Sequence, residues 1–467
     1  MDIANRNKVF IDRDYLHSLL ERKAPEQNEI NNILNKSLEL KGLNLEEVAA
    51  LLCVEDKNQI QQIMNAAHKV KDEIYGKRLV LFAPIYTGNV CCNNCTYCSF
   101  RKDNHLIKRK ILTMEEIEQE TSALLKQGHK RVLLICGENN KNGTEYMCEA
   151  IRRTYGVREN NGRDYIRRIN VELAPMEVED FAMLHKEKIG TYVCFQETYD
   201  SELYKRFHPA GTPKADYAYR LTVMDRAQEG GINDVGIGAL FGLGDYKFEV
   251  LGLMQHAKHL EDCYGCGPHT VSIPRLEPAI GAPDAEHVPQ PVSDDDFKKL
   301  VAIIRIALPY TGMILSTREN SAMRNELINF GISQISAGSR TNPGAYAEED
   351  GTGSQFELGD HREMEDVINS FIDAGYIPSF CTGCYRKGRV GEDFMDLAKP
   401  GLIKQYCLPN AIFTFQEYLN DFAHEDTKQR GMKLIKQMLE EYDQKQLIPK
   451  IESNLNEINN GQRDLYF

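Results

Sequence analysis

Eight short apolar segments alternate with amphipathic segments between residues 79 and 336, and this alternation constrains the fold more than any other feature of the chain. Short apolar segments bounded by turn residues are typical of buried strands. Strands that alternate with helices predict a parallel sheet with right-handed crossovers, and eight strands are the number that closes a (βα)8 TIM-type barrel. An open, doubly wound sheet is the alternative. The predicted strands are Leu79 to Ile85, Arg131 to Cys136, Ile169 to Ala174, Thr191 to Phe195, Val235 to Phe241, Thr270 to Pro274, Met313 to Thr317 and Ile332 to Ser336.

The amphipathic segments between these strands carry helix signals. Thr113 and Glu116 form a capping box ahead of the apolar positions of a helix predicted from Thr113 to Lys126, and Gly128 follows it. Ser293 and Asp296 introduce another helix. The two segments indicate that helices connect the strands.

Helical segments also flank the predicted barrel. Leucine and isoleucine residues recur at helical spacing between residues 12 and 75, whereas the alternation of strands and helices stops after Ser339. A chain of 467 residues also exceeds what one simple core usually fills. We therefore predict an N-terminal helical extension (1–76), the barrel (77–375) and a mainly helical C-terminal domain (376–467).

Thirteen cysteines, an odd number, accompany an N-terminus without the apolar stretch of a signal peptide. This usage is typical of a reducing compartment in which thiols bind metals or react, so we expect a cytoplasmic protein. The formal net charge of −13 repels phosphate and anionic lipid, and no apolar segment is long enough to span a bilayer. We therefore expect neither a nucleic acid nor a membrane as partner.

The first cysteine cluster, Cys91-x3-Cys95-x2-Cys98, follows directly on the first predicted strand. In a barrel this position lies at the C-terminal mouth, where active sites assemble. Three closely spaced thiolates can hold three irons of a 4Fe-4S cluster and leave the fourth iron without a protein ligand. A structural zinc site would favour a fourth ligand nearby. Cys92, on the same loop, is expected to serve packing.

The string NVCCNNCTYCSF around this cluster matches the signature of the radical S-adenosylmethionine (SAM) family. The resemblance implies that the open iron binds SAM and that one electron then yields a 5′-deoxyadenosyl radical. It also implies a set of SAM contacts: Tyr97 and Phe100 beside the cluster and adenine, Gly137 and Glu138 at the methionine amino group, Glu197 at the ribose, and Arg220 at the carboxylate.

A second cluster, Cys381-x2-Cys384-x22-Cys407, again offers three thiolates without an obvious fourth ligand, which favours a second iron-sulfur cluster. Its surroundings, CTGCYRKGRVGEDF and AKPGLIKQYCLPNA, are similar to the auxiliary-cluster domain of the tyrosine-cleaving maturases of FeFe-hydrogenase. The similarity extends over nearly the whole chain, through FQETY, VGIGALFGL, GPHTVSIPRLEPA, LSTRE and SAGSRTNPG.

Members of that family cleave tyrosine between Cα and Cβ to p-cresol and dehydroglycine, and convert the latter to carbon monoxide and cyanide. The resemblance implies an extra iron on the auxiliary 4Fe-4S cluster, bridged by L-cysteine and partly held by a histidine that matches His269. It further implies a low-potential electron donor and other hydrogenase maturation proteins as partners. Cys263-x2-Cys266, just before His269, departs from the family pattern.

Arg318 and either Ser339 or Arg340 follow the last two predicted strands and face the same mouth as the first cluster, so we expect them to bind the tyrosine carboxylate. Two alternatives remain. The 2-iminoacetate synthase of thiamine biosynthesis also cleaves tyrosine, although the extended C-terminal cysteine cluster argues against it. A non-catalytic metal scaffold would use both clusters only to stabilise loops.

Overall fold

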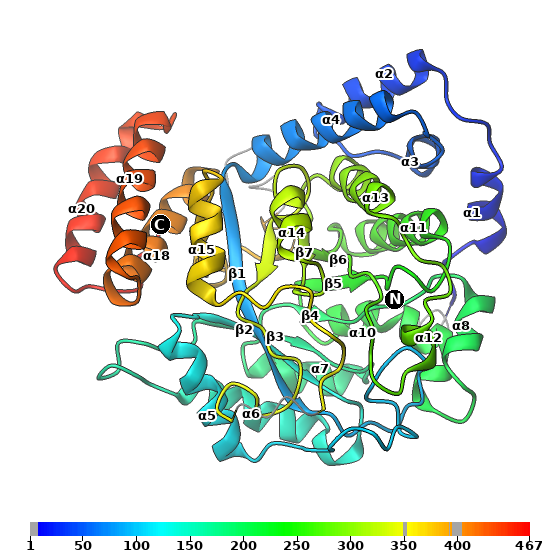
Figure 1. The fold of residues 1–467 in the computed structure, drawn as a ribbon, viewed down its shortest axis with the longest axis horizontal. Helices are drawn as coiled ribbons and strands as arrows, with labels where there is room; N and C mark the ends of the chain where they lie inside the picture. The colour runs from blue at the N-terminus through cyan, green and yellow to red at the C-terminus, as the bar shows by residue number, and fades with distance from the viewer. Residues whose placement is uncertain (1–7, 349–352, 392, 395–403) are drawn as a thin grey trace.

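The computed structural model describes residues 8–348, 353–391, 393–394 and 404–467, and its centre is a closed barrel of parallel strands (Figure 1). The strands follow one another from β2 to β8, β8 pairs with β1, and β1 pairs again with β2. The predicted barrel is therefore confirmed, and the open sheet is wrong. The strands are β1 (Arg78–Gly88), β2 (Arg131–Cys136), β3 (Arg168–Glu172), β4 (Tyr192–Val193), β5 (Val235–Gly238), β6 (Thr270–Ser272), β7 (Gly312–Leu315) and β8 (Gln334–Ser336).

A further strand, β9 (Ile377–Ser379), joins the sheet without being foreseen from the sequence. It pairs in parallel with Arg78–Val80 at the beginning of β1, whereas β2 pairs with β1 from Ala83 onward. β9 therefore lies at the N-terminal end of the barrel. The segment that follows it, which carries the second cysteine cluster, begins at the end of the barrel opposite to the first cluster.

Helices surround the strands, as the capping signals predicted. Thr113 accepts a hydrogen bond from the Glu116 amide while the Glu116 carboxylate accepts one from Thr113, and Ser293 caps α13. The helices of the barrel are α5 (Met114–Lys126), α6 (Thr144–Gly156), α7 (Val178–Lys186), α8 (Ser201–Phe207), α9 (Tyr217–Leu221), α10 (Val223–Glu229), α11 (Tyr246–Tyr264), α12 (Pro283–Glu286), α13 (Asp294–Ala307) and α14 (Ser321–Leu327), with short 3₁₀ turns η2 (Asn140–Asn142) and η3 (Pro213–Ala215).

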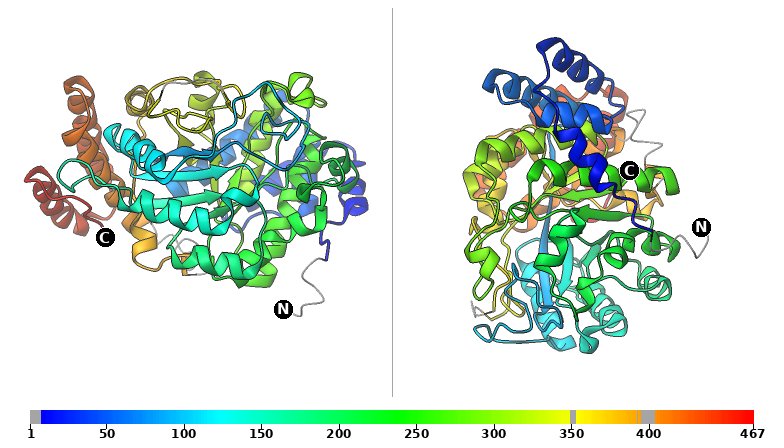
Figure 2. Two further views of the ribbon diagram at one scale, coloured as in Figure 1. Left: turned by 90° about the horizontal axis from the view of Figure 1, so that it is seen from below. Right: turned by 90° about the vertical axis from the view of Figure 1, so that its right-hand side faces the viewer.

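Two groups of helices flank the barrel on different sides (Figure 2). The N-terminal group packs on α11 and α13 and comprises α1 (Arg13–Leu20), α2 (Gln27–Ser37), α3 (Leu45–Leu52) and α4 (Lys57–Tyr75). The C-terminal group comprises α15 (Met364–Asp373), α16 (Gly383–Arg386), α18 (Lys404–Asp421), α19 (Glu425–Glu441), η4 (Lys445–Leu447) and α20 (Ile448–Asn459), and α18 packs on β9. The division of the chain into three domains at residues 76 and 375 remains a proposal. β9 belongs to the third of these domains, yet it forms hydrogen bonds with β1 of the barrel sheet.

Within the described ranges, none of the helices combines the length and apolar character required to cross a lipid bilayer.

Candidate active site

The first cysteine cluster lies on the loop that leaves the C-terminal end of β1. Burial, together with the Cys95 and Cys91 thiols, raises the pKa of Cys98 to about 12, so the three thiols lie near one another. Asn93 donates its backbone N–H to Cys91 Sγ at 3.4 Å, and Gln355 Nε2 lies 3.8 Å from Cys98 Sγ. Amide donors at cysteine sulfurs are typical of iron-sulfur sites, and metal binding would displace the thiol protons. This donor set fits a 4Fe-4S cluster.

The end of β2 packs tightly against the same loop. A Cβ atom at Gly137 would lie 2.6 Å from the carbonyl oxygen of Val90, so only glycine permits this approach. Next to it, the Glu138 carboxylate accepts a hydrogen bond from Asn93 Nδ2 at 2.5 Å, and the Glu138 carbonyl accepts one from the Cys92 amide at 2.7 Å. The structure thus places Gly137 and Glu138 directly beside the cysteine loop.

A buried charge cluster lies next to this loop and centres on Glu197. Lys214 Nζ lies 2.5 Å from Glu197 Oε1, and Arg220 approaches the same oxygen to 3.6 Å. Burial by itself would raise the pKa of Glu197, but Lys214 and Arg220 outweigh it and lower the pKa, so this carboxylate is charged. Glu197 also has a φ of 72°, a left-handed conformation that costs a residue with a side chain energy and that occurs at functional sites.

Lys214 is a member of this site that sequence reasoning missed. It sits in the 3₁₀ turn η3, and its backbone N–H donates to Asn93 Oδ1 at 2.8 Å, which joins the charge cluster to the cysteine loop. The two aromatic residues expected here are buried: the Tyr97 hydroxyl lies 2.7 Å from His208 Nε2, and the Phe100 ring meets that of Tyr86 edge to face.

A cavity of about 80 Å³ occupies the interior of the barrel below the first cluster, and Arg318 and Ser339 line it. The Arg318 guanidinium stacks on the Phe356 ring at 3.3 Å. Glu172, at the end of β3, also lines the cavity, and burial and the nearby Glu197 raise its pKa to about 7. The sequence did not single out Glu172, because polar and apolar residues alternate in β3 as they do in an ordinary strand.

The cavity is linked to the first cluster by a short chain of hydrogen bonds. Tyr86 donates its hydroxyl to Gln355 Oε1 at 2.9 Å, and the amide nitrogen of Gln355 faces Cys98. Arg340 is not brought to this cavity: its guanidinium contacts Glu363 at 3.3 Å and the Ser339 carbonyl. Of the two candidates that follow the last strand, the structure therefore brings Ser339 and not Arg340 to the lining of the cavity.

The second cysteine cluster lies at the N-terminal end of the barrel. Cys381 follows β9, Cys384 lies on α16 and Cys407 in the first turn of α18. Burial, with the Cys407 and Cys381 thiols, raises the pKa of Cys384 to about 12, and Gly383 donates its N–H to Cys381 Sγ at 3.3 Å. The three cysteines therefore lie in one region of the structure, although they come from three separate elements.

Basic side chains at the beginnings of β1 and β2 surround this second cluster. Burial opposes the charge of Arg78, yet the Cys407 and Cys381 thiolates outweigh it and raise its pKa. Arg131 donates to the Cys381 carbonyl at 2.7 Å. A buried guanidinium beside three cysteines stabilises thiolates, as a bound cluster requires. This donor set also fits an iron-sulfur cluster.

His269, just ahead of β6, lies beside the second cluster. Its Nε2 is 3.0 Å from the hydroxyl of Tyr385, the residue after Cys384, and its Nδ1 is 3.5 Å from Asp234 Oδ1. The guanidinium of Arg168 stacks on the Tyr385 ring. Asp234, which is 2% exposed and which also accepts the Gly391 N–H at 3.0 Å, was not foreseen, since an aspartate before a strand is an ordinary turn residue.

Comparison with known proteins places these features in a family. Residues 85–257 match the Radical SAM superfamily and residues 272–377 match the Biotin and Thiamin Synthesis associated domain. A crystal structure of HydG, a maturase of the FeFe-hydrogenase, superposes with a TM-score of 0.95 at 47% identity, covering 98% of this chain and 100% of that chain. The HydG maturase from Carboxydothermus hydrogenoformans gives a TM-score of 0.83 at 40% identity, over 97% and 100% of the two chains.

The 2-iminoacetate synthase of Salmonella typhimurium is 31% identical over 74% of this chain and 89% of that protein. The closed barrel with three cysteines on the loop after β1 defines a radical SAM protein, a class that carries a 4Fe-4S cluster and uses SAM. Within that class, the chain belongs to the HydG family.

Proposed function

We propose that this protein is a radical SAM tyrosine lyase of FeFe-hydrogenase maturation. It cleaves L-tyrosine between Cα and Cβ to p-cresol and dehydroglycine, and converts the dehydroglycine to carbon monoxide and cyanide at a second cluster. The observation that carries the proposal is the location of Cys381, Cys384 and Cys407 in one region near His269, at the end of the barrel opposite to the first cysteine cluster. The similarity to HydG over 98% of the chain supports it.

Residues around the first cluster bind the cofactors. Cys91, Cys95 and Cys98 hold a 4Fe-4S cluster, which together with SAM supplies a 5′-deoxyadenosyl radical when both are bound. Glu197 accepts hydrogen bonds from the ribose hydroxyls, and the guanidinium fork of Arg220 suits the SAM carboxylate. The contact of 3.6 Å between Arg220 and Glu197 Oε1 favours the charged form of both side chains, although both are buried.

The cavity below the first cluster binds tyrosine, and because tyrosine occupies more than about 80 Å³, the lining side chains move apart as the substrate enters. Arg318 pairs with the tyrosine carboxylate and Ser339 adds a hydroxyl from the next strand end, because both line the cavity. Its interior position keeps water from the reacting carbon atoms, which suppresses side reactions of a radical and of dehydroglycine. Tyrosine bound there would turn its amino group, from which the radical would take a hydrogen, toward the Cys98 side of the cavity, where Tyr86 and Gln355 lie.

The second cluster carries out the later chemistry. Cys381, Cys384 and Cys407 would hold an auxiliary 4Fe-4S cluster, and His269 would help to hold an extra iron that is bound together with L-cysteine. Asp234 orients the His269 ring through Nδ1, in the manner of carboxylates behind metal-bound histidines. A low-potential electron donor and other maturation proteins are the expected partners, in a reducing cytoplasm in which the thirteen cysteines form no disulfides.

Two rival functions give different products. A 2-iminoacetate synthase would form p-cresol without carbon monoxide, and the similarity to such enzymes covers a smaller part of the chain, 74% against 98%. A non-catalytic metal scaffold would bind zinc at both clusters and would form no p-cresol.

The test is anaerobic incubation of the reconstituted protein with SAM, dithionite and tyrosine, in which p-cresol and carbon monoxide are followed together. We expect the wild type to form both, Cys91→Ala to form neither, and Cys407→Ala to form p-cresol alone. Cys148→Ala, a buried cysteine on α6, is the matched control and should form both. Carbon monoxide from Cys407→Ala would refute the role of the second cluster, and the absence of p-cresol from the wild type would refute the proposal.

A further inference from the structure

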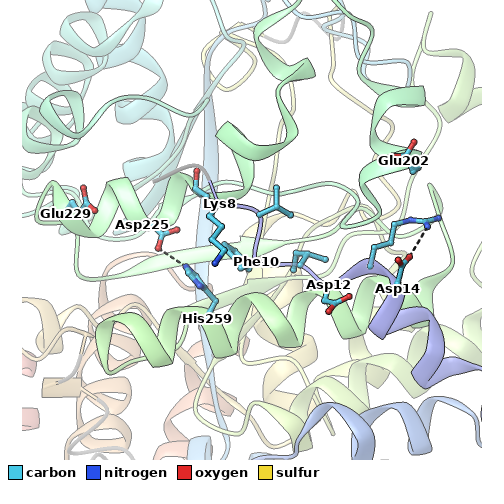
Figure 3. Close-up of a pocket in the computed structure, with 12 residues that line it drawn as sticks. Lys8, Phe10, Asp12, Asp14, Glu202, Asp225, Glu229 and His259 are labelled. Atoms are coloured by element: carbon cyan, nitrogen blue, oxygen red, sulfur yellow. Dashed lines mark hydrogen bonds and ion pairs between the residues drawn. The ribbon is translucent and has the colours of Figure 1, made fainter. Parts of the chain in front are cut away.

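A group of possible metal ligands lies on the outer wall of the barrel, apart from both cysteine clusters. It consists of Asp225 on α10 and of His259 and Cys263 on α11, whose ligand atoms all lie within 4.8 Å of one another. His259 Nε2 is 2.8 Å from Asp225 Oδ1, and Cys263 Sγ is 3.8 Å from His259 Nδ1. Figure 3 shows His259 and Asp225 pointing toward one another from two helices.

Local structure holds these side chains in place. His259 and Cys263 are four residues apart on α11, so they project from the same side of the helix. The Phe10 ring stacks on the His259 ring at 3.8 Å, and the Tyr264 hydroxyl donates to Asp225 Oδ1 at 3.1 Å. The positions of the imidazole and of the carboxylate are therefore fixed by neighbours from three different segments.

The Asp225 carboxylate has an unsatisfied oxygen. Asp225 is 4% exposed, and its Oδ2 is buried and without a hydrogen-bond partner in the described parts of the chain. A buried carboxylate oxygen without a partner costs free energy, and a cation is one way to satisfy it. A pocket of about 830 Å³ that Asp225 and His259 line connects this place with solvent.

We propose that Asp225, His259 and Cys263 bind a zinc ion. A thiolate, an imidazole and a carboxylate are the ligands that Zn²⁺ takes in proteins, and three protein ligands leave a fourth tetrahedral position for water. Small side-chain rotations would open the 2.8 Å contact between His259 and Asp225 to admit the ion. Binding releases the thiol proton of Cys263, while the neutral His259 ring keeps its single proton on the nitrogen that does not face the ion.

This site gives Cys263 a role separate from that of Cys266, its neighbour in the CxxC motif. Cys263 is exposed and faces His259, whereas Cys266 is buried, and a Cβ atom at Gly391 would lie 3.9 Å from its sulfur. Gly391 belongs to the segment that follows the Cys384 helix. The two thiols therefore contact different parts of the protein, and the zinc ion links α10 to α11.

The experiment adds one equivalent of Zn²⁺ to the anaerobically reconstituted full-length protein, removes unbound metal, and measures zinc and iron per chain. We expect about one zinc per chain in the wild type and in the control Cys266→Ala, with unchanged iron, and an at least ~10-fold lower zinc content in Cys263→Ala and His259→Ala. Zinc K-edge X-ray absorption should show one sulfur at about 2.3 Å among nitrogen and oxygen ligands.

Cys263 is exposed, so its replacement leaves the fold intact even if the His259 variant is unstable. Three results would overturn the proposal: no zinc retained by the wild type, equal zinc in the wild type and Cys263→Ala, or a shell of three sulfurs, which would place the zinc at a cysteine cluster.

Discussion

The hydroxyl of Tyr385 lies 3.0 Å from Nε2 of His269, and this hydrogen bond ties the loop of the second cysteine cluster to the beginning of strand β6. On the other side of the same ring, Nδ1 faces the Asp234 carboxylate. A histidine whose Nδ1 donates to a carboxylate presents Nε2 as its metal-binding atom. Tyr385 therefore occupies the atom of His269 that would bind the extra iron.

The partnership of Asp234 and His269 gives the first prediction. Asp234→Asn removes the charge that orients the ring, so we expect roughly 10-fold weaker retention of the extra iron with p-cresol formation unchanged. Iron per chain after chelation and the electron paramagnetic resonance spectrum with added iron and cysteine measure this. Asp262→Asn, a surface aspartate paired with Lys258, is the control. Unaltered iron retention in Asp234→Asn would exclude the orienting role.

A second prediction concerns the charge cluster beside the first cluster. Glu197→Gln removes the charged acceptor that Lys214 and Arg220 surround. The Kd for SAM should therefore rise by about 10-fold or more, as expected when a charged hydrogen bond is lost. Equilibrium dialysis of the reconstituted protein measures the Kd for SAM. Glu202→Gln on the exposed side of α8 should leave it unchanged. Equal affinities of the wild type and Glu197→Gln would show that Glu197 does not contact SAM.

A third prediction concerns Arg318 and Arg340, two candidates for binding the tyrosine carboxylate, of which Arg318 lines the cavity below the first cluster. Arg318→Met should raise KM for tyrosine by roughly 10-fold or more, because it removes the partner of the carboxylate. Arg340→Met is the matched control, since the Arg340 guanidinium contacts Glu363 outside the cavity, and its KM should stay near that of the wild type. Initial rates of p-cresol formation at varied tyrosine give both values. A larger effect at Arg340 would reverse the assignment.

A fourth prediction concerns Glu249 on α11, whose titration should make the stability of the folded protein depend on pH. Its burial raises its pKa from 4.5 to about 8, so the folded protein holds the proton over a range in which the unfolded chain has lost it. The stability that this proton provides is present below pH 4.5 and is lost as the pH rises toward 8. We expect the Tm of the wild type to fall relative to that of Glu249→Gln across this interval, in anaerobic thermal unfolding. A constant difference would mean that Glu249 does not titrate.

The last prediction concerns Arg305 on α13, which is fully buried. Its guanidinium donates to the carbonyl oxygens of Pro309 and Thr311, which precede β7, and of Gly331, which precedes β8. Arg305→Met leaves these carbonyls without partners and should lower the free energy of unfolding by about 3 kcal/mol or more. Denaturant unfolding measures it, and exposed Arg152→Met should change it by less than about 0.5 kcal/mol. A small effect at Arg305 would mean that water replaces it.

The barrel could be predicted because its strands differ from its helices in apolar periodicity, and because Thr113 and Ser293 cap helices in the way their neighbours indicate. β9 could not. It has three residues and contains Pro378, so it carries no periodic signal, and its pairing with β1 depends on contacts more than 290 positions apart in the chain.

The candidate sites were predictable where the spacing of residues carries the chemistry, as in the two cysteine clusters. Lys214 was missed because a lysine in a loop is typical of a solvated surface, and only the fold brings it to Glu197. The sequence could not decide between Ser339 and Arg340. Successive side chains of an extended segment alternate in direction, and the structure brings Ser339 to the cavity. Asp225 and Cys263 meet only where α10 packs beside α11.

β1 is attached to functional loops at both of its ends, since β9 pairs with its first residues and the Cys91 loop leaves its last. An inserted or deleted residue within Arg78–Gly88 would move one end by about 3.3 Å and turn the intervening side chains to the opposite face. A change in the length of this strand would therefore displace one cysteine cluster relative to the other, whereas an exposed surface loop tolerates such a change.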